Sequence, residues 1–260
     1  MPNLLNVNKE DLGTKYPFIG YGDEGRVYNY NNTYAIKIFT KLRNPEYKSK
    51  YQRKLQKLEE MFELNDPNYA FPMGFVSIEG QNIDGYYTTL VKHKQSLKDF
   101  EDLELLHNKK KILEYLIKAD KALQRIHSQG IIIGDIKEDN ILIDQENNPI
   151  YIDTDNYKYK QYSFDLIPDR AGTFYSMYGS TSLSYRDNDI LVFSIMALYL
   201  LTRLENFSFM NSPMIIDKTL AKLNFDRETQ REIDYIFSKK TDKPYIGPVL
   251  KKINPYNLVK

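Results

Sequence analysis

The chain has 260 residues, 42% of them hydrophobic, so it is long enough for one large domain or two lobes that each bury a core. Its 36 basic and 35 acidic residues leave a formal net charge of +1, which gives no overall field to attract nucleic acid or an anionic membrane. The sequence has no cysteine, which excludes disulfides, thiolate chemistry and cysteine-ligated zinc, and its three scattered histidines indicate no metal cluster.

No stretch of the sequence is typical of a targeting signal or a membrane span. Residues 1–11 lack the basic head and apolar core of a secretory signal. Residues 190–201 are almost wholly apolar, but the run is too short to cross a bilayer and is more typical of a buried helix. We therefore expect a cytoplasmic protein with no membrane or nucleic-acid partner.

The first motif along the chain is a glycine-rich stretch in residues 18–28. Its pattern G-x-G-x-x-G-x-V is carried by Gly20, Gly22, Gly25 and Val27. In a dinucleotide-binding fold the third glycine would open a helix. Here an aromatic and β-branched run follows, and then an Asn-Asn pair, so we expect the glycines to form the bend of a strand hairpin.

Residues 34–39 are expected to form the next strand, because they are rich in β-branched and aromatic side chains. Period-two alternation puts Ala35, Lys37 and Phe39 on one face of that strand. A purine could then lie against Ala35, and phosphates against Lys37, beneath the glycine loop. The alternative is an ordinary hairpin with a solvated lysine.

A helix is expected over residues 46–64, with Pro45 at its front. Its apolar stripe would consist of Tyr51, Leu55, Leu58 and Phe62. Glu59 lies about 70° from the centre of this stripe and Glu60 about 170°, so Glu59 is the better candidate to pair with Lys37. We expect a solvated basic face, with a docking surface for an acidic partner as the alternative. That face would comprise Lys48, Lys50, Arg53, Lys54 and Lys57.

Two further strands are expected at residues 71–76 and 86–91, around an Asp84-Gly85 turn, to complete a sheet of about five strands. Leu90 and Val91 end the last strand and lead into a possible linker between lobes. Backbone groups there could hydrogen-bond an adenine edge.

Residues 108–129 are expected to form a helix that ends before Gly130, with His127 packed on its last turn. Two apolar runs follow at residues 141–143 and 150–152, and the turn-rich spacer between them predicts an antiparallel hairpin.

Three oxygen-bearing side chains flank this hairpin. Asp135 and Asn140 precede its first strand, and Asp153 follows its second, so they would converge at one end. Carboxylate and carboxamide oxygens grouped in this way suit Mg²⁺. The alternative is a loop in which Asp and Asn only form turns.

The segment at residues 156–189 has few periodic apolar positions and many hydroxyl groups. Loops of this length in compact domains are usually functional or mobile. Asp189, at the start of the buried helix, is expected to cap that helix and to bond the backbone of the loop that carries Asp135.

In this order and spacing, these pieces resemble the eukaryotic-type protein kinases. The likeness rests on GYGDEGRV as the glycine loop, AIK as the lysine strand, GDIKEDN as the catalytic loop, DTD as the metal-binding triplet and DILVFS as the start of a central helix. It implies an α+β, two-lobed protein-kinase-like fold forming one domain. A small antiparallel sheet lobe would occupy residues 1–91, and a larger, mainly helical catalytic lobe residues 92–260.

The resemblance also implies roles in the transfer of phosphate from ATP. Asp135 would be the base or orienter of the acceptor hydroxyl, and Lys137 would steady the transferring phosphoryl group. Asn140 and Asp153 would hold Mg²⁺. The residues that contact or position the nucleotide would be Gly20, Gly22, Gly25, Val27, Ala35, Lys37, Glu59, Leu90 and Val91.

The sequence departs from the family pattern in three places. Ile133-Gly134 replaces the usual His-Arg, so no arginine is present there to bind a phosphate on the loop, and control by loop phosphorylation is not expected. Thr154-Asp155 replaces the usual Phe-Gly, and Asp155 could supply a further carboxylate to the metal. No Ala-Pro-Glu occurs between residues 156 and 189, so the peptide-docking shelf would be absent or rebuilt.

Three functions remain open from the sequence. We expect MgATP-dependent transfer of the γ-phosphoryl group to a serine or threonine hydroxyl of a protein, an acceptor that the sequence does not identify. Gly-Asp in place of Arg-Asp, with Ile-Asp-x-Asp, also looks like the aminoglycoside and choline phosphotransferases. Lys137 and the complete glycine loop argue against that alternative. A third possibility is a nucleotide-binding pseudokinase scaffold. The oligomeric state does not follow from the sequence.

Overall fold

The computed structural model describes residues 3–22, 24–40, 48–80, 82–99, 106–164, 184–202, 225–238 and 240–255. The chain divides into two compact units, Met1–Lys92 with Ile150–Asp155, and His93–Pro149 with Asn156–Lys260. The expectations for Pro45 and for most of the segment 156–189 lie outside the described residues.

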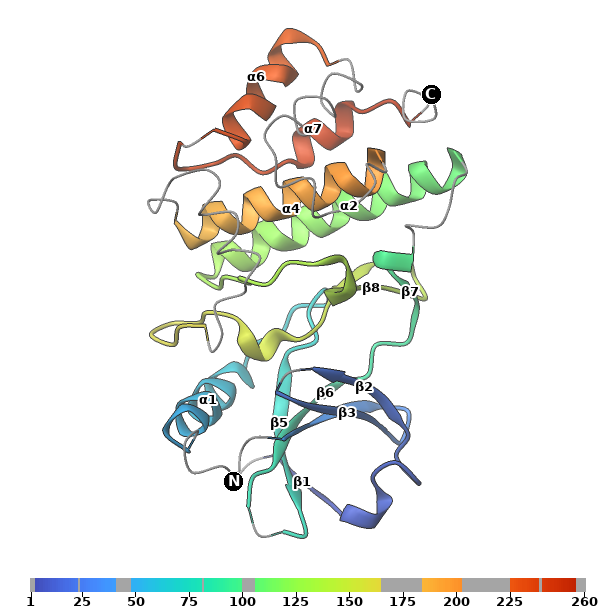
Figure 1. The fold of residues 1–260 in the computed structure, drawn as a ribbon, viewed down its shortest axis with the longest axis vertical. Helices are drawn as coiled ribbons and strands as arrows, with labels where there is room; N and C mark the ends of the chain where they lie inside the picture. Colours follow the sequence, from blue (N-terminus) through green and yellow to red (C-terminus); the bar gives the residue numbers. More distant parts are fainter. Residues whose placement is uncertain are drawn as a thin grey trace. The chain divides into compact units, whose positions relative to one another are not determined.

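The first unit is built on a six-stranded sheet with the order β1-β5-β6-β4-β3-β2 (Figure 1). All its neighbouring strands are antiparallel except β1 and β5, which are parallel. The expectation of a purely antiparallel sheet is therefore wrong at this edge, where the N-terminal strand adds to β5. The strands are β1 (Leu4–Val7), β2 (Phe18–Gly22), β3 (Gly25–Tyr30), β4 (Tyr34–Phe39), β5 (Pro72–Ile78) and β6 (Gly85–Thr89).

The glycine-rich stretch forms a strand hairpin, as the sequence predicts. Gly22 on β2 lies opposite Gly25 on β3. The next turn, between β3 and β4, places Asn31 and Asn32 at φ angles of 52° and 55°. Two successive positive φ angles are typical of the tight hairpin turn that Asn favours. The local turn residues therefore set the register of β2, β3 and β4.

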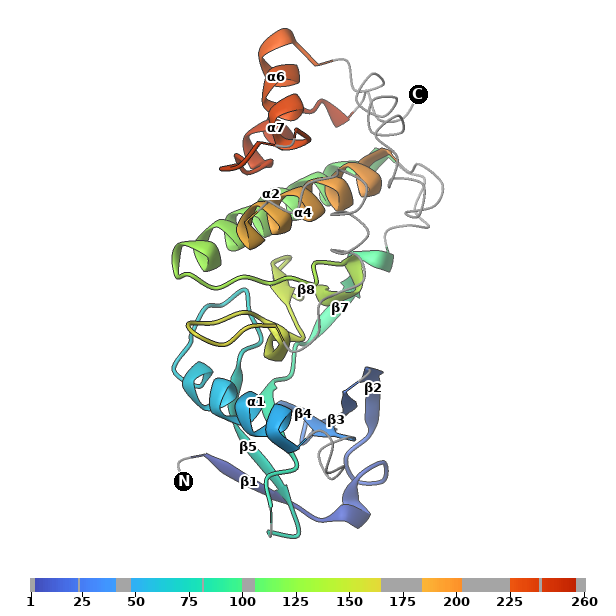
Figure 2. The same cartoon turned by 60° about the vertical axis from the view of Figure 1, so that its left-hand side comes forward.

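The two faces of β4 belong to different hydrophobic clusters, which confirms the predicted alternation. One cluster consists of Val7, Tyr16, Tyr28, Ile36 and Val76. The other consists of Phe39, Tyr51, Leu58, Phe75 and Tyr86, and it includes residues of the helix α1 (Lys48–Met61). Figures 1 and 2 show α1 beside β5. Lys37, two residues before Phe39, therefore faces the side of the sheet that α1 covers.

Helix α1 buries Tyr51 and Leu58 of the predicted apolar stripe, but it buries two lysines as well. Leu55 and Phe62 are only partly buried. Lys54 and Lys57 are 0% and 1% exposed, so the expectation that both belong to a solvated face is wrong. Arg53 is exposed as expected. The helix thus turns two lysines inward, and such side chains are rarely buried without partners.

The second unit is mainly helical. Its helices are α2 (Leu106–Ser128), α4 (Tyr185–Thr202), α6 (Arg227–Ile236) and α7 (Gly247–Lys252). Helices α2 and α4 lie side by side in both Figure 1 and Figure 2. Lys109 of α2 donates to the carbonyl oxygens of Leu200 and Leu201, at 3.3 and 2.6 Å, and so satisfies the C-terminal end of α4. In the described ranges, no helix is long and apolar enough to cross a membrane.

The predicted strands around the 145–149 spacer are present as β8 (Ile141–Asp144) and β9 (Pro149–Tyr151). The turn between them is closed by Asp144, whose carbonyl oxygen accepts from the Asn147 amide at 3.2 Å and whose carboxylate accepts from the Asn148 amide at 2.7 Å. Strand β7 (His93–Ser96) pairs with β8 in antiparallel fashion. The division between the units falls within β9, because Ile150–Asp155 belongs to the first unit.

Candidate functional site

Lys37 lies in the middle of the sheet of the first unit. On β4 it is opposite Val27 of β3 and Tyr86 of β6, so these three side chains share one face. Lys37 is only 6% exposed. A buried ammonium group requires compensating charges, and the segment after β9 supplies them.

Two carboxylates bind the Lys37 ammonium group. Its Nζ atom lies 2.6 Å from Oδ1 of Asp153, and 2.9 and 3.1 Å from Oδ1 and Oδ2 of Asp155. Burial alone would lower the pKa of Lys37, but Asp155, the neighbouring Tyr86 and Asp153 raise it well above the ordinary value. Lys37 is therefore a permanent cation in this environment.

Asp155 is the centre of the cluster. Besides Lys37, its carboxylate accepts from the Tyr86 hydroxyl at 2.8 Å and lies 2.7 Å from Nζ of Lys54. Burial would raise the pKa of Asp155, but Lys37 and Lys54 hold it well below its usual range. Burial, followed by the charge of Asp155, raises the pKa of Tyr86 well above its usual range, so its hydroxyl stays protonated and can donate.

Lys54 extends the cluster to the glycine hairpin. Its Nζ atom also binds the carboxylate of Glu24, the residue before Gly25 in the hairpin. Lys50, one helical turn earlier, lies 3.3 Å from the other Glu24 oxygen. The side chains thus form a row of alternating charges that joins the hairpin, α1 and the segment after β9. In order, the row is Glu24, Lys54, Asp155, Lys37 and Asp153.

Backbone pairing holds the segment after β9 in the first unit. The Tyr151 amide donates to the Asn68 carbonyl oxygen at 2.7 Å, and the Tyr151 carbonyl oxygen accepts from the Ala70 amide at 2.9 Å. Buried Thr154, where the kinase pattern has phenylalanine, donates its hydroxyl to the Ala70 carbonyl oxygen at 2.9 Å. Asp153 between them has a φ of 59°. Asp tolerates this left-handed conformation better than most residues, and strained backbone of this kind is often found at functional sites.

Two expectations about this cluster need correction. The Lys37–Glu59 ion pair does not form, because Glu59 is exposed on α1 and Lys37 binds Asp153 and Asp155 instead. Asp155 does not fit the part of an open metal ligand, since both its oxygens are bound by buried donors. Asp155 is the counter-ion of Lys37, the role that the sequence analysis predicts for Glu59.

The other predicted nucleotide contacts lie on the same sheet, except Leu90 and Val91, which come after the end of β6 at Thr89. Val27 and Ala35 face the side that carries Lys37. Leu90 follows β6, and its amide donates to the Thr33 carbonyl oxygen at 3.0 Å, so that amide is already paired. The three glycines of the motif occupy β2 and the start of β3.

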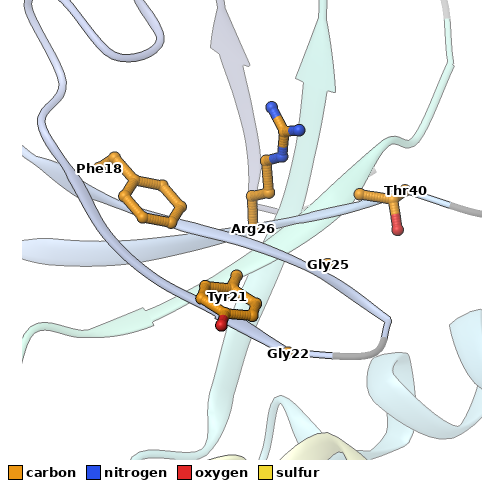
Figure 3. A pocket seen from close by; sticks show the side chains of 6 residues that line it. All are labelled: Phe18, Tyr21, Gly22, Gly25, Arg26 and Thr40. Atoms are coloured by element: carbon orange, nitrogen blue, oxygen red, sulfur yellow. The ribbon is translucent and has the colours of Figure 1, made fainter.

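A surface pocket of about 450 Å³ lies at the glycine hairpin, on the sheet face opposite to the one that carries Lys37 (Figure 3). It is lined by Phe18, Tyr21, Gly22, Gly25, Arg26 and Thr40. Tyr21 is opposite Arg26, and Arg26 is opposite Ile38, which packs against the cluster on the sheet face away from α1. This pocket is therefore separate from the face that carries Lys37.

In the second unit, the loop before β8 brings its predicted residues together. Nζ of Lys137 lies 2.9 Å from Oδ2 of Asp135, and both side chains are partly exposed. The Asn140 side-chain amide donates to the Asp135 carbonyl oxygen at 3.3 Å, and among the described residues none donates to the Asn140 side-chain oxygen. A short 3₁₀ helix, Glu138–Asn140, sets this spacing.

Asp189 supports the same loop from α4. Its carboxylate accepts from the amides of Ile133 and Gly134 at 2.7 and 2.9 Å, which confirms that Asp189 bonds the loop backbone. The expectation that Asp189 caps the helix is wrong, because α4 already begins at Tyr185. His127 of α2 contributes as well, with Nε2 3.0 Å from Asp189 and Nδ1 3.0 Å from the Tyr245 hydroxyl. The sequence predicted His127 only as a packed residue, because Tyr245 and Asp189 are far from it along the chain.

Gly134 has a φ of 79°, and a Cβ atom there would collide with the ring of Phe164. A backbone position of this kind favours glycine over the arginine that the kinase pattern has. The departure from that pattern thus has a local structural reason.

The donor set available for a metal is small. Within the described ranges, no three His, Cys, Asp or Glu side chains are grouped closely enough to hold a metal ion. Asp153 in the first unit offers a carboxylate, and Asn140 in the second unit a carboxamide, each an oxygen donor of the kind that suits Mg²⁺.

The comparisons with known proteins provide no relative from which to transfer a function. No protein-family model matches the chain, and no curated protein is significantly similar to it. What the chain can do therefore has to follow from two polar clusters: the charged row around Lys37 in the first unit, and the Asp135–Lys137–Asn140 loop in the second.

Proposed function

We propose that the chain is a MgATP-dependent phosphotransferase with a two-lobed, protein-kinase-like fold, which transfers the γ-phosphoryl group to a serine or threonine hydroxyl of a protein. The observation that carries the proposal is the buried Lys37 beneath the glycine hairpin, bonded to Asp153 of the DTD triplet. A fixed lysine cation in this setting suits the α and β phosphates of ATP, with a carboxylate beside it for the metal.

The residues of the first unit would bind the nucleotide. Val27 and Ala35 provide small apolar surface on the sheet face of Lys37, against which a purine can lie. Lys37 would contact the phosphates while its ion pair with Asp155 keeps the ammonium group in place. Asp155 thus takes over the positioning role that the kinase resemblance gives to Glu59.

The residues of the second unit would act on the acceptor. Asp135 is partly exposed, and its carboxylate could orient an incoming hydroxyl and take its proton. Lys137, 2.9 Å from that carboxylate, would balance the negative charge of the transferring group.

Asp153 and Asn140 would hold Mg²⁺, in keeping with their donor chemistry. The ion would neutralise charge on the β and γ phosphates as the bond to the leaving oxygen breaks. The proposal requires the groups of both units to act on the same nucleotide, and the experiment below tests that requirement directly.

The loop before β8, which carries Asp135, supports activity that does not depend on phosphorylation of the segment after the DTD triplet. In kinases under such control, an arginine beside the catalytic aspartate binds the phosphate. Here Gly134 takes that position, and its amide is already bonded to Asp189.

The test is a transfer assay with purified chain, γ-labelled ATP, Mg²⁺ and a generic protein acceptor. We expect label on the acceptor or on the chain itself, and none with Asp135→Asn. Asp139→Asn is the matched control, because Asp139 is in the same loop and its side chain is exposed and paired only at the surface with Lys98.

Two outcomes would replace the proposal. If wild type and Asp135→Asn bind ATP equally and neither transfers phosphate to any acceptor, the chain is a nucleotide-binding scaffold. If amino alcohols or aminoglycosides are phosphorylated and proteins are not, it is a small-molecule phosphotransferase.

A further inference from the structure

We propose that Lys54 of α1 is a positioning residue for Lys37, and that it acts by clamping the glycine hairpin and the DTD segment to the same helix. The inference rests on the proposed function. The sequence analysis expects the helix to supply a carboxylate, Glu59, but here the helix supplies a cation, and the carboxylates come from the two segments that it joins.

The first support is burial. The side chain of Lys54 is fully buried, as is that of Asp155, and the side chain of Glu24 is 6% exposed. Removing charges from water is costly unless each has a partner with good geometry. Lys54 meets this condition through the two carboxylates, so its placement depends on both segments at once.

The second support is the sharing of Asp155. One oxygen of this carboxylate accepts from Tyr86 at 2.8 Å and from Lys37 at 2.9 Å. The other oxygen lies 2.7 Å from Lys54 and 3.1 Å from Lys37. Lys54 is therefore the closer cation on that second oxygen, and it fixes the direction in which the carboxylate faces Lys37.

The consequence concerns how strongly Lys37 is held. With Lys54 in place, the charge of Asp155 is divided between two ammonium groups. Without Lys54, Lys37 alone would have to balance it, and would be drawn toward Asp155 and away from the position of the phosphates. Lys54 thus sets the position of the Lys37 ammonium group without itself contacting the nucleotide.

Lys50 is the natural control. It binds Glu24 from the same helix at 3.3 Å, and its side chain is 32% exposed. Lys50 contacts Glu24 of the hairpin, and no ion pair joins it to Asp155, so Lys50→Met removes a cation of the same type from one end of the clamp only.

The first measurement is amide hydrogen exchange in the full chain, which needs no nucleotide. We expect Lys54→Met to speed exchange about tenfold both in the hairpin around Gly25 and in the segment around Thr154. Lys50→Met should speed amide exchange in the hairpin alone. In Lys54→Arg, exchange in both segments should be as slow as in wild type. If Lys54→Met leaves either segment unchanged, the clamp is refuted. If Lys54→Met does not fold, Lys54→Gln serves in its place, since its amide can still donate to one carboxylate.

The second measurement is a double-mutant cycle on MgATP affinity by calorimetry. We expect Lys54→Met to weaken binding about tenfold in the wild-type background and to have no further effect in the Lys37→Met background. Equal losses in both backgrounds would overturn a role through Lys37.

The two measurements separate this inference from the proposed function. If wild type binds no MgATP, the phosphotransferase proposal fails, and with it the nucleotide role of Lys54. The exchange experiment would still establish or refute the clamp itself.

Discussion

Lys37 and Asp155 are joined at both carboxylate oxygens, at 2.9 and 3.1 Å, although they are 118 positions apart in the chain. Both side chains are buried. The counter-ion of the sheet lysine thus comes from the segment after β9 and not from α1.

Asp155→Asn should lower the free energy of unfolding by about 3–5 kcal/mol, because two buried lysines would lose a charged partner. Urea denaturation followed by far-ultraviolet circular dichroism would measure it. Asp139→Asn changes a carboxylate whose side chain is 44% exposed and should alter the same quantity by less than about 0.5 kcal/mol. A loss as small as that of the control would mean that Asp155 contributes no net stabilisation.

Glu59→Gln should leave both MgATP affinity and stability unchanged, because Glu59 is exposed and does not contact Lys37. Lys37→Met, in contrast, should weaken affinity strongly. Calorimetric titration of the two variants side by side would check this. If Glu59→Gln weakened MgATP affinity as much as Lys37→Met, the result would instead support the Lys37–Glu59 ion pair that the kinase resemblance implies.

Asp189→Ala should destabilise the loop before β8 by about 2–4 kcal/mol, because the buried Ile133 amide, the Gly134 amide and the His127 ring would each lose an acceptor. Nuclear magnetic resonance should show faster amide exchange at Ile133 and Gly134. Asp234→Ala, which changes an exposed carboxylate on α6, should alter neither amide. Unchanged protection in Asp189→Ala would show that another group holds the loop.

Asp120 should make stability fall as pH rises. Burial raises its pKa from 3.8 to about 6, against opposing hydrogen bonds from Gln124 and from the amides of Gly247 and Ile246. The folded state therefore binds this proton more tightly than the unfolded state. The stabilising contribution is fully present below pH 4 and is lost as pH rises through about 6.

Asp120→Asn should remove that pH dependence, since an amide does not ionise. Its free energy of unfolding should exceed that of wild type by about 1–3 kcal/mol at pH 7.5, and the gap should close toward pH 4. Urea denaturation at a series of pH values would measure both curves. Parallel curves would mean that Asp120 ionises normally in the folded chain.

Local signals in the sequence are sufficient for strands β2, β3 and β4, but not for the parallel pairing of β1 with β5, which are distant in the chain. The hairpin at Gly22 and Gly25, the turn at Asn31 and Asn32 and the alternation along β4 all follow from residues that are neighbours in the chain. These features depend on turn chemistry and side-chain period, which a single sequence displays directly.

The burial of Lys54 and Lys57 on α1 could not be predicted in the same way. The apolar pattern of α1 correctly predicts Tyr51 and Leu58 as buried, but charged residues are usually exposed, so the two lysines are expected on the solvated face. A buried lysine is recognisable only once its carboxylate is known, and Asp155 lies far along the chain. For the same reason the helical pattern favours Glu59 as the partner of Lys37, because Glu59 lies closer than Glu60 to the centre of the predicted apolar stripe. The roles of Asp135, Lys137 and Asn140 stay predictions.

The backbone passes between the two units at residues 92–93, 149–150 and 155–156. A fragment ending at Lys92 would retain β1 to β6 and α1, yet it would leave Lys37 and Lys54 without the carboxylate that they share. Such a fragment should therefore be poorly soluble when expressed by itself. A synthetic peptide spanning Ile150–Asp155, added in trans, should rescue it by split-protein complementation.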